Sequence, residues 1–249
     1  MPYIDITQLE TTNLQNVDEL LATDIYERLY ELIRSALDVA KKAMGAINQD
    51  FDAQRQHNTT LIDGARGTGK STVLVNLPLY LEDRSKKNGT PTELDPFKRV
   101  HILKPIDPTL LEEHDSLFLQ VIVAAVLSDQ GVTNQNKHDE LRYRHMLKKL
   151  EELASGFESV QAQKEERGID KVRSFIYLRQ LNRLVHEFFK SVLSLLDKEL
   201  LVITIDDVDT SLDRAFENLK IVRRYLNTPL VFPIISGDLM TCPPLAVPS

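Results

Sequence analysis

Apolar residues recur at helical spacing in several stretches of the chain. Over residues 23–48 they are three or four positions apart, which predicts an amphipathic helix. The same spacing predicts further helices over 116–128, 137–167, 170–197 and 212–226. A helix is also expected over 71–80, with its end or a bend at Pro78, which has no backbone N–H, and with a polar loop over 86–91.

Shorter apolar runs between these helices have the length and residue types of buried strands. They cover residues 59–63, 99–103, 199–205 and 230–235. Strands that alternate with helices indicate an α/β fold of three layers, with a mostly parallel sheet and helices on both faces. The two long, charged helices over 137–197 are expected to form a helical hairpin inserted into this core.

The pattern divides the chain into three parts. Residues 1–58 are expected to form an N-terminal arm, extended over 1–20, and a helix. Residues 59–238 form the predicted core, with the helical insertion at 137–197. Residues 239–249 follow neither periodicity and contain several prolines, so an irregular tail is expected there.

A glycine-rich turn joins the first predicted strand to the helix that follows it. Its sequence is Gly64-Ala65-Arg66-Gly67-Thr68-Gly69-Lys70-Ser71, which matches the phosphate-binding pattern G-x-x-x-x-G-K-[ST]. Successive amides from Arg66 to Ser71 would form an anion-binding nest at a helix N-terminus. Lys70 would reach the β- and γ-phosphates, and Thr72 would lie near the α-phosphate. The Ser71 hydroxyl would bind Mg²⁺. The alternative is a turn that only packs.

Two carboxylates follow the apolar run 199–205 directly. Asp206 would contact Mg²⁺, usually through a coordinated water, and Asp207 would orient or polarise the attacking water. The alternative interpretation is a helix N-cap, a position that aspartate commonly occupies and for which Asp209 and Thr210 are also candidates.

A polar residue also ends the strand 230–235. Ser236 is the candidate for holding the attacking water or the γ-phosphate, with Asp238 as the second choice. An ordinary turn is the alternative at this position. The sequence therefore predicts three groups of chemically active residues, each at the end of a different strand.

Composition and charge limit the partners, the metal sites and the cellular compartment that are expected for this protein. The formal net charge of −7 argues against a broadly basic nucleic-acid-binding surface, but it leaves a nucleic-acid partner open. The single cysteine, Cys242, excludes an internal disulfide and a cysteine-built zinc site. No apolar stretch approaches the roughly 18 residues that span a bilayer, and the N-terminus lacks the pattern of a secretory signal. A cytoplasmic protein with no membrane partner is expected.

The motifs together resemble the additional-strand class of P-loop ATPases, which includes the AAA+ and STAND groups. The segments 205–209, 221–226 and 234–238 look most like KAP-type and related STAND NTPases. They are also similar to the ATPase subunit of the RADAR antiphage system, and the segment 103–109 is similar to such defence ATPases too.

The resemblance implies magnesium-dependent ATP hydrolysis in bacterial antiviral defence. It also implies a homo-oligomer, or a protein partner bound through the helical insertion or a missing C-terminal region. Such families carry a fifth strand, an arginine finger and a helical lid beyond this point, so the chain is expected to be truncated. Many AAA+ proteins have Asp-Glu where this chain has Asp206-Asp207, so hydrolysis is expected to be slow.

Two other functions fit the same motifs. One is a nucleotide-gated signalling or assembly scaffold with little turnover, whose helical insertion binds a partner. The other is a DNA-handling ATPase, against which the acidic net charge weighs. No base-reading motif is evident, so the sequence leaves the preference between ATP and GTP open.

Overall fold

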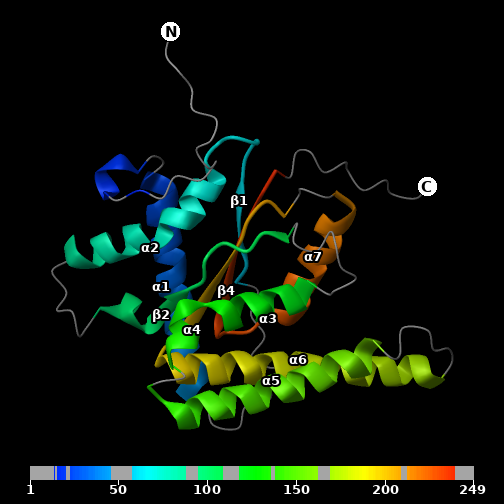
Figure 1. Ribbon diagram of the computed structural model, residues 1–249. Coiled ribbons are helices and arrows are strands. Elements are labelled where there is room, and N and C mark those ends of the chain that lie inside the picture. The colour runs from blue at the N-terminus through cyan, green and yellow to red at the C-terminus, as the bar shows by residue number, and fades with distance from the viewer. Residues whose placement is uncertain are drawn as a thin grey trace, which may run out of the picture.

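A computed structural model describes residues 14, 16–20, 23–45, 58–87, 95–108, 118–135, 138–161, 169–208 and 212–238. Within these ranges the chain forms a four-stranded sheet and seven α-helices (Figure 1). All strand pairs of this sheet are parallel. The α/β class and the parallel sheet that the sequence predicts are therefore confirmed.

The strands do not lie in the sheet in their chain order. They are β1 (Thr60–Asp63), β2 (Val100–Ile102), β3 (Leu200–Ile205) and β4 (Val231–Gly237). Their spatial order is β1-β4-β3-β2, so the last strand lies between the first and the third. Because all four are parallel, their carboxyl ends lie at one edge of the sheet.

The helices lie near their predicted positions. They are α1 (Thr23–Gly45), α2 (Lys70–Lys87), α3 (Phe118–Ser128), α4 (Gln130–Gln135), α5 (Glu140–Gln161), α6 (Ile169–Leu196) and α7 (Leu212–Tyr225). Short 3-10 helices cover Val17–Glu19 and Pro96–Arg99. The short helix α4 was not predicted, because only one of its residues, Val132, is buried and the rest show no apolar period.

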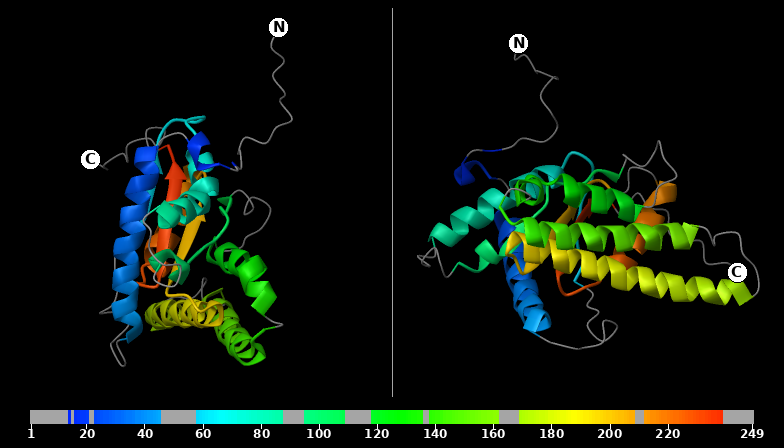
Figure 2. Two further views of the ribbon diagram at one scale, coloured as in Figure 1. Left: turned by 90° about the vertical axis from the view of Figure 1, so that its left-hand side faces the viewer. Right: turned by 60° about the horizontal axis from the view of Figure 1, so that its bottom comes forward.

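Alternate residues of β3 point into two separate hydrophobic clusters, one on each face of the sheet. Leu200 and Val202 pack in the cluster that α1 and α2 cover. Leu201, Ile203 and Ile205 pack in the other, against α3, α6 and α7. Every residue of β3 is buried, as expected for a central strand with helices on both faces. The edge-on view shows α1 on one side of the sheet and α3 on the other (Figure 2).

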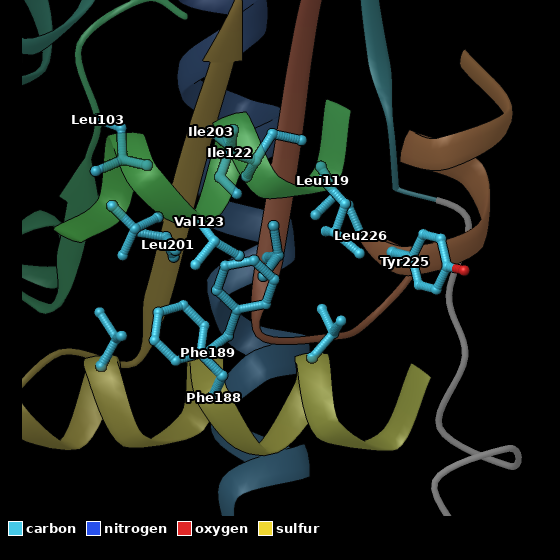
Figure 3. Close-up of a cluster of buried hydrophobic side chains, with 14 of the residues drawn as sticks. Leu103, Leu119, Ile122, Val123, Phe188, Phe189, Leu201, Ile203, Tyr225 and Leu226 are labelled. Atoms are coloured by element: carbon cyan, nitrogen blue, oxygen red, sulfur yellow. The ribbon is translucent and has the colours of Figure 1, made fainter. Parts of the chain in front are cut away.

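The larger cluster joins the sheet to α3 and α6 (Figure 3). Phe188 and Phe189 of α6 are fully buried, with ring centroids 5.6 Å apart. In the close-up they point from α6 toward Val123 of α3, which crosses in front of the strands. This packing fixes α6 against the sheet, because each aromatic side chain removes a large apolar area from water.

Of the two expectations at Pro78, an end or a bend of the second helix, the end is wrong. The helix α2 continues through Pro78 to Lys87, so Lys86 and Lys87 are helical rather than part of a polar loop. Pro78 lies on the exposed side of the helix, while the neighbouring Leu77 and Leu81 are buried in the core. Burial of this apolar face offsets the loss of one backbone hydrogen bond.

The helices α5 and α6 lie side by side along their length, in antiparallel directions (Figures 1 and 2). Gly156 of α5 permits the close contact, because a Cβ there would meet Leu184 Cδ1 of α6 at 2.8 Å. The predicted helix 137–167 begins later than expected, at Glu140. Its predicted break at Gly168 lies outside the described residues.

Some expectations fall on parts of the chain that the structure does not describe. These are most of the arm 1–20, most of the loop before β1, and the tail 239–249 with Cys242. Within the described ranges, none of the helices combines the length and the apolar character needed to cross a membrane.

Candidate functional site

The carboxyl edge of the sheet brings the three predicted groups of residues to one end of the molecule. The loop 64–69 follows β1, Asp206 and Asp207 follow β3, and Ser236 lies near the end of β4. In register, Asp63 of β1 is paired with Gly237 of β4, and Ile205 of β3 is paired with Ile235. Because β4 lies between them, β1 and β3 are two strand spacings apart, or about 10 Å.

Two glycines of the loop have backbone conformations that L-residues rarely adopt. Gly67 has a φ of 82° and Gly69 a φ of 87°. A Cβ at either position would meet no atom within 4 Å, so conformation rather than space requires glycine here. The Thr68 amide donates to the Ala65 carbonyl at 3.3 Å, which closes a turn with Gly67 in its third position, as in a type II turn.

The ammonium group of Lys70 lies inside this loop. Its Nζ donates to the Gly64 carbonyl at 2.7 Å and to the Ala65 carbonyl at 3.1 Å, and the residue is only 7% exposed. An ammonium has three donors, so these two bonds hold the charge in place without using its full capacity. A fixed cation surrounded by loop backbone suits an anionic ligand.

The first turn of α2 adds backbone donors at the same edge. The first helical bond of α2 runs from the Val73 amide to the Gly69 carbonyl at 3.0 Å. The amides of Lys70, Ser71 and Thr72 precede this bond, so they belong to the donors that a helix N-terminus cannot satisfy internally. They lie at the positive end of the helix dipole, which favours an anion.

Two residues outside the motif brace this first turn. The Asn76 side chain donates to the Thr72 carbonyl at 2.8 Å and accepts from the Leu14 amide at 2.8 Å. The Tyr26 hydroxyl of α1 donates to the same Thr72 carbonyl at 3.4 Å. Burial raises the pKa of Tyr26 to about 12, so the phenol remains a donor at neutral pH. The sequence did not predict a role for either residue. In the structure, Asn76 stands out as a buried amide four positions after Thr72.

The residues after β3 are tied to β4 by several hydrogen bonds. The Ser236 hydroxyl, fully buried, donates to Asp206 Oδ1 at 2.5 Å and accepts from the Asp207 amide at 3.0 Å. The Val208 amide donates to the Ser236 carbonyl at 3.0 Å. Asp207 has a φ of 44°, in the left-handed region that aspartate tolerates better than most residues. These bonds fix the backbone that carries both carboxylates.

A backbone hydrogen bond extends this network to the glycine-rich loop. The Gly64 amide donates to the Gly237 carbonyl at 3.2 Å. Two consecutive residues of β4 therefore make these contacts: Ser236 binds Asp206, and Gly237 binds the start of the loop at Gly64. Lys70, Gly64, Gly237, Ser236 and Asp206 are thus joined by direct contacts or a single peptide link.

Oxygen donors suited to Mg²⁺ are present at this edge. Ser71 offers a hydroxyl at the start of α2, and Asp206 offers a carboxylate whose described hydrogen bonds use only Oδ1. Mg²⁺ prefers such hard oxygen ligands and usually takes only one or two from the protein, with phosphate and water completing its shell. Within the described residues no group of three or more His, Cys, Asp or Glu could hold a metal. The hydroxyl of Ser71 and the carboxylate of Asp206 fit a Mg²⁺ ion whose other ligands are phosphate and water.

The remaining predicted residues lie at or beyond the ends of the same strands. Asp238, the second choice at the end of β4, follows this strand directly and is half-buried. The N-cap candidates Asp209 and Thr210 lie outside the described residues. An open groove of about 410 Å³ lies between α5 and α6 and is lined partly by Tyr177 and Arg183. These two helices lie at the opposite end of the sheet (Figure 1).

Comparison with known proteins gives no further identification. No protein-family model matches the chain, and the search of curated proteins gives no match either.

Proposed function

We propose that this chain is a P-loop ATPase of the additional-strand class, which binds ATP with Mg²⁺ at the carboxyl edge of its sheet and hydrolyses it. One observation carries the proposal. The phosphate-binding motif follows β1, the acidic pair follows β3, and β4 lies between them with hydrogen bonds to both. Enzymes that bind nucleotides on parallel sheets use this edge, outside the carboxyl ends of the strands.

The loop and the first turn of α2 would bind the phosphates. The amides from Gly67 to Thr72 are the donors, and the positive φ values of Gly67 and Gly69 allow the backbone to approach the ligand closely. Lys70 would donate its remaining N–H to the β- and γ-phosphates, from a position fixed by the Gly64 and Ala65 carbonyls. This arrangement is preorganised, because the loop is held by its own hydrogen bonds.

The metal site would use Ser71 and Asp206. Bound Mg²⁺ would neutralise phosphate charge and polarise the terminal phosphoryl group. Ser71 would supply its hydroxyl, and Asp206 its carboxylate, directly or through water. The hydrogen bond from Ser236 to Oδ1 restricts rotation of the Asp206 side chain and so orients its carboxylate.

The hydrolysis step would depend on Asp207 and Ser236. Asp207 would accept a hydrogen bond from the attacking water and so orient it toward the phosphorus. Its left-handed backbone, held by the bond from its amide to Ser236, sets the direction of its side chain. Aspartate is one methylene shorter than the glutamate common in AAA+ proteins, so slow turnover is part of the proposal.

The proposed biological role comes from the resemblance described above. The chain would be the nucleotide-binding part of a cytoplasmic, bacterial antiviral defence ATPase of the AAA+/STAND type, with KAP-like motifs. It would act as a homo-oligomer or with a protein partner, which α5 and α6 would bind.

The test is direct measurement of ATP binding and of phosphate release. Calorimetry with Mg-ATP should give saturable binding by the chain, and Lys70→Ala should weaken it by about 100-fold or more, because a buried charge-assisted contact is lost. Lys86→Ala is the matched control, since Lys86 lies on the same helix but is exposed and paired with Glu82. Asp206→Asn, a second variant of nearly unchanged shape, should reduce the Mg²⁺ dependence of binding.

Three outcomes separate the candidate functions. ATP affinity that is equal in the parent chain and Lys70→Ala would refute the proposed site. Binding without repeated turnover would favour the nucleotide-gated scaffold. Strong, salt-sensitive stimulation of phosphate release by DNA would favour the DNA-handling ATPase.

A further inference from the structure

Arg66 is the exposed cation of the glycine-rich loop. It occupies the second position of the turn 65–68, which the bond from the Thr68 amide to the Ala65 carbonyl closes. The loop has one other cation, Lys70, which is buried and holds loop carbonyls. The two charges therefore have different environments: one is fixed beneath the backbone, and the other is presented to solvent at the carboxyl edge.

The backbone beneath Arg66 is held firmly. The Ala65 carbonyl accepts hydrogen bonds from the Thr68 amide at 3.3 Å, from the Thr68 hydroxyl at 2.8 Å and from Lys70 Nζ at 3.1 Å. Gly67 then turns the chain with its φ of 82°. Because the turn is already fixed, ligand binding by Arg66 would cost less conformational entropy. Only the rotamers of the arginine side chain would have to be ordered.

Carboxylates at the same edge would make a second cation favourable for binding a polyphosphate. Asp206, Asp207 and Asp238 follow the neighbouring strands at the same edge, and each would repel a polyphosphate. Mg²⁺ and Lys70 would offset part of this repulsion. A guanidinium can add two parallel hydrogen bonds to phosphate oxygens, which a point charge cannot.

The direction of the loop indicates which phosphate Arg66 would meet. The motif runs from the turn 65–68 to the first turn of α2, where Thr72 is expected near the α-phosphate. Arg66 lies at the opposite end of the motif, before Gly67 and Gly69, and is exposed. With the α-phosphate at the Thr72 end, the end that carries Arg66 would be the one nearer the terminal phosphate.

We infer that Arg66 contacts the terminal phosphate of the bound nucleotide and makes the site prefer a nucleoside triphosphate over a diphosphate. The inference depends on the proposed nucleotide-binding function, which it deepens. Arg66 is in this view a specificity-determining residue, and the discrimination comes from charge-assisted hydrogen bonds that a diphosphate cannot make.

The experiment compares the affinities for Mg-ATP and Mg-ADP, measured by calorimetry, in the parent chain and in Arg66→Ala. The affinity for ATP should fall by about 10- to 100-fold, as expected for the loss of hydrogen bonds to a charged group, while that for ADP changes by less than about threefold. Arg66→Lys keeps the charge without the planar fork, so its ATP affinity should be intermediate. Arg34→Ala removes an exposed arginine of α1 and is the matched control.

The controls separate a failure of this inference from a failure of the proposed function. If Arg66→Ala lowers ATP and ADP affinities equally, or changes neither, while Lys70→Ala abolishes ATP binding, the inference is wrong and the proposed site stands. If the parent chain binds neither nucleotide, both fail. Melting curves of the variants should match that of the parent chain, because the Arg66 side chain is exposed.

Discussion

The hydroxyl of Ser236 donates a 2.5 Å hydrogen bond to Oδ1 of Asp206, and so joins the end of β4 to the residue after β3. The same oxygen accepts from the Asp207 amide. A single buried hydroxyl thereby orients both carboxylates of the acidic pair, one through its side chain and one through its backbone. Removal of this hydroxyl should affect the proposed chemistry more than nucleotide binding.

For Ser236→Ala we expect turnover of ATP to fall by about tenfold or more, with little change in the affinity for Mg-ATP. The free energy of unfolding should fall by about 1.5–3 kcal/mol, because a hydrogen bond to a charged group is lost. Steady-state phosphate release, calorimetry and urea unfolding measure the three quantities. Ser191→Ala is the control: this buried serine of α6 bonds only to the Phe188 carbonyl, at 2.6 Å, among the described contacts. A Ser236 variant with unchanged turnover would contradict the assigned role.

The proline inside α2 leads to a second prediction. Pro78 cannot donate to the Leu74 carbonyl, and its exposed ring adds little to the core. In Pro78→Ala this bond can form, so the free energy of unfolding should rise by about 1–2 kcal/mol after the greater flexibility of the unfolded chain is included. Urea unfolding measures the change.

Pro96→Ala is the matched control for this prediction. Pro96 starts a 3-10 helix, where a missing N–H has no cost, so its replacement should leave stability unchanged or lower it. Equal effects of the two substitutions would show that Pro78 imposes no strain on α2.

The third prediction concerns the pH dependence of stability. His186 Nδ1 of α6 and Thr228 Oγ1 lie 2.8 Å apart in a hydrogen bond, and Thr228 is fully buried before β4. Burial lowers the pKa of His186 to about 4, with Glu187 raising it and Lys190 lowering it. The unfolded chain therefore binds a proton that the folded chain does not bind between about pH 6.5 and pH 4.

Stability should consequently fall as the pH decreases through this window, by about 2–3 kcal/mol from His186 alone. The contribution is complete above pH 6.5, and below pH 4 no more is lost. His186→Gln cannot titrate and can still bond Thr228, so its free energy of unfolding should decline less over the same range. Urea unfolding at intervals between pH 7 and pH 4 measures both. His145→Gln, an exposed histidine of α5, should keep the parent slope.

Much of the fold follows from local pattern, and the exceptions have physical causes. The run Leu200–Ile205 is apolar throughout and becomes a strand buried on both faces, as such runs do in parallel sheets. Pro78 misled the assignment of α2 because tertiary packing outweighed a local cost. The order of the strands has no local signature, because it depends on which distant segments pair.

The candidate site divides in the same way. The spacing of Gly64, Gly69 and Lys70 matches the phosphate-binding pattern, and this match can be read from the sequence without the fold. The position of Ser236 at a strand end makes it a candidate from the sequence. Its hydrogen bond to Asp206 could not be predicted, because it depends on β4 lying beside β3 in the sheet. The brace of Tyr26 and Asn76 was missed because a polar residue on an amphipathic helix gives no sign of its partner.

The place of β4 in the sheet has a consequence for biosynthesis. In the described sheet, β1 pairs only with β4, which the ribosome makes some 170 residues later. Until Val231–Gly237 has emerged, the N-terminal strand has no neighbour in the sheet, and its glycine-rich loop is separated from the acidic pair. Pairing across such a long stretch of chain slows folding, because the entropy of loop closure is lost before the contacts form. A nascent chain should therefore assemble the candidate site only after Val231–Gly237 has emerged from the ribosome.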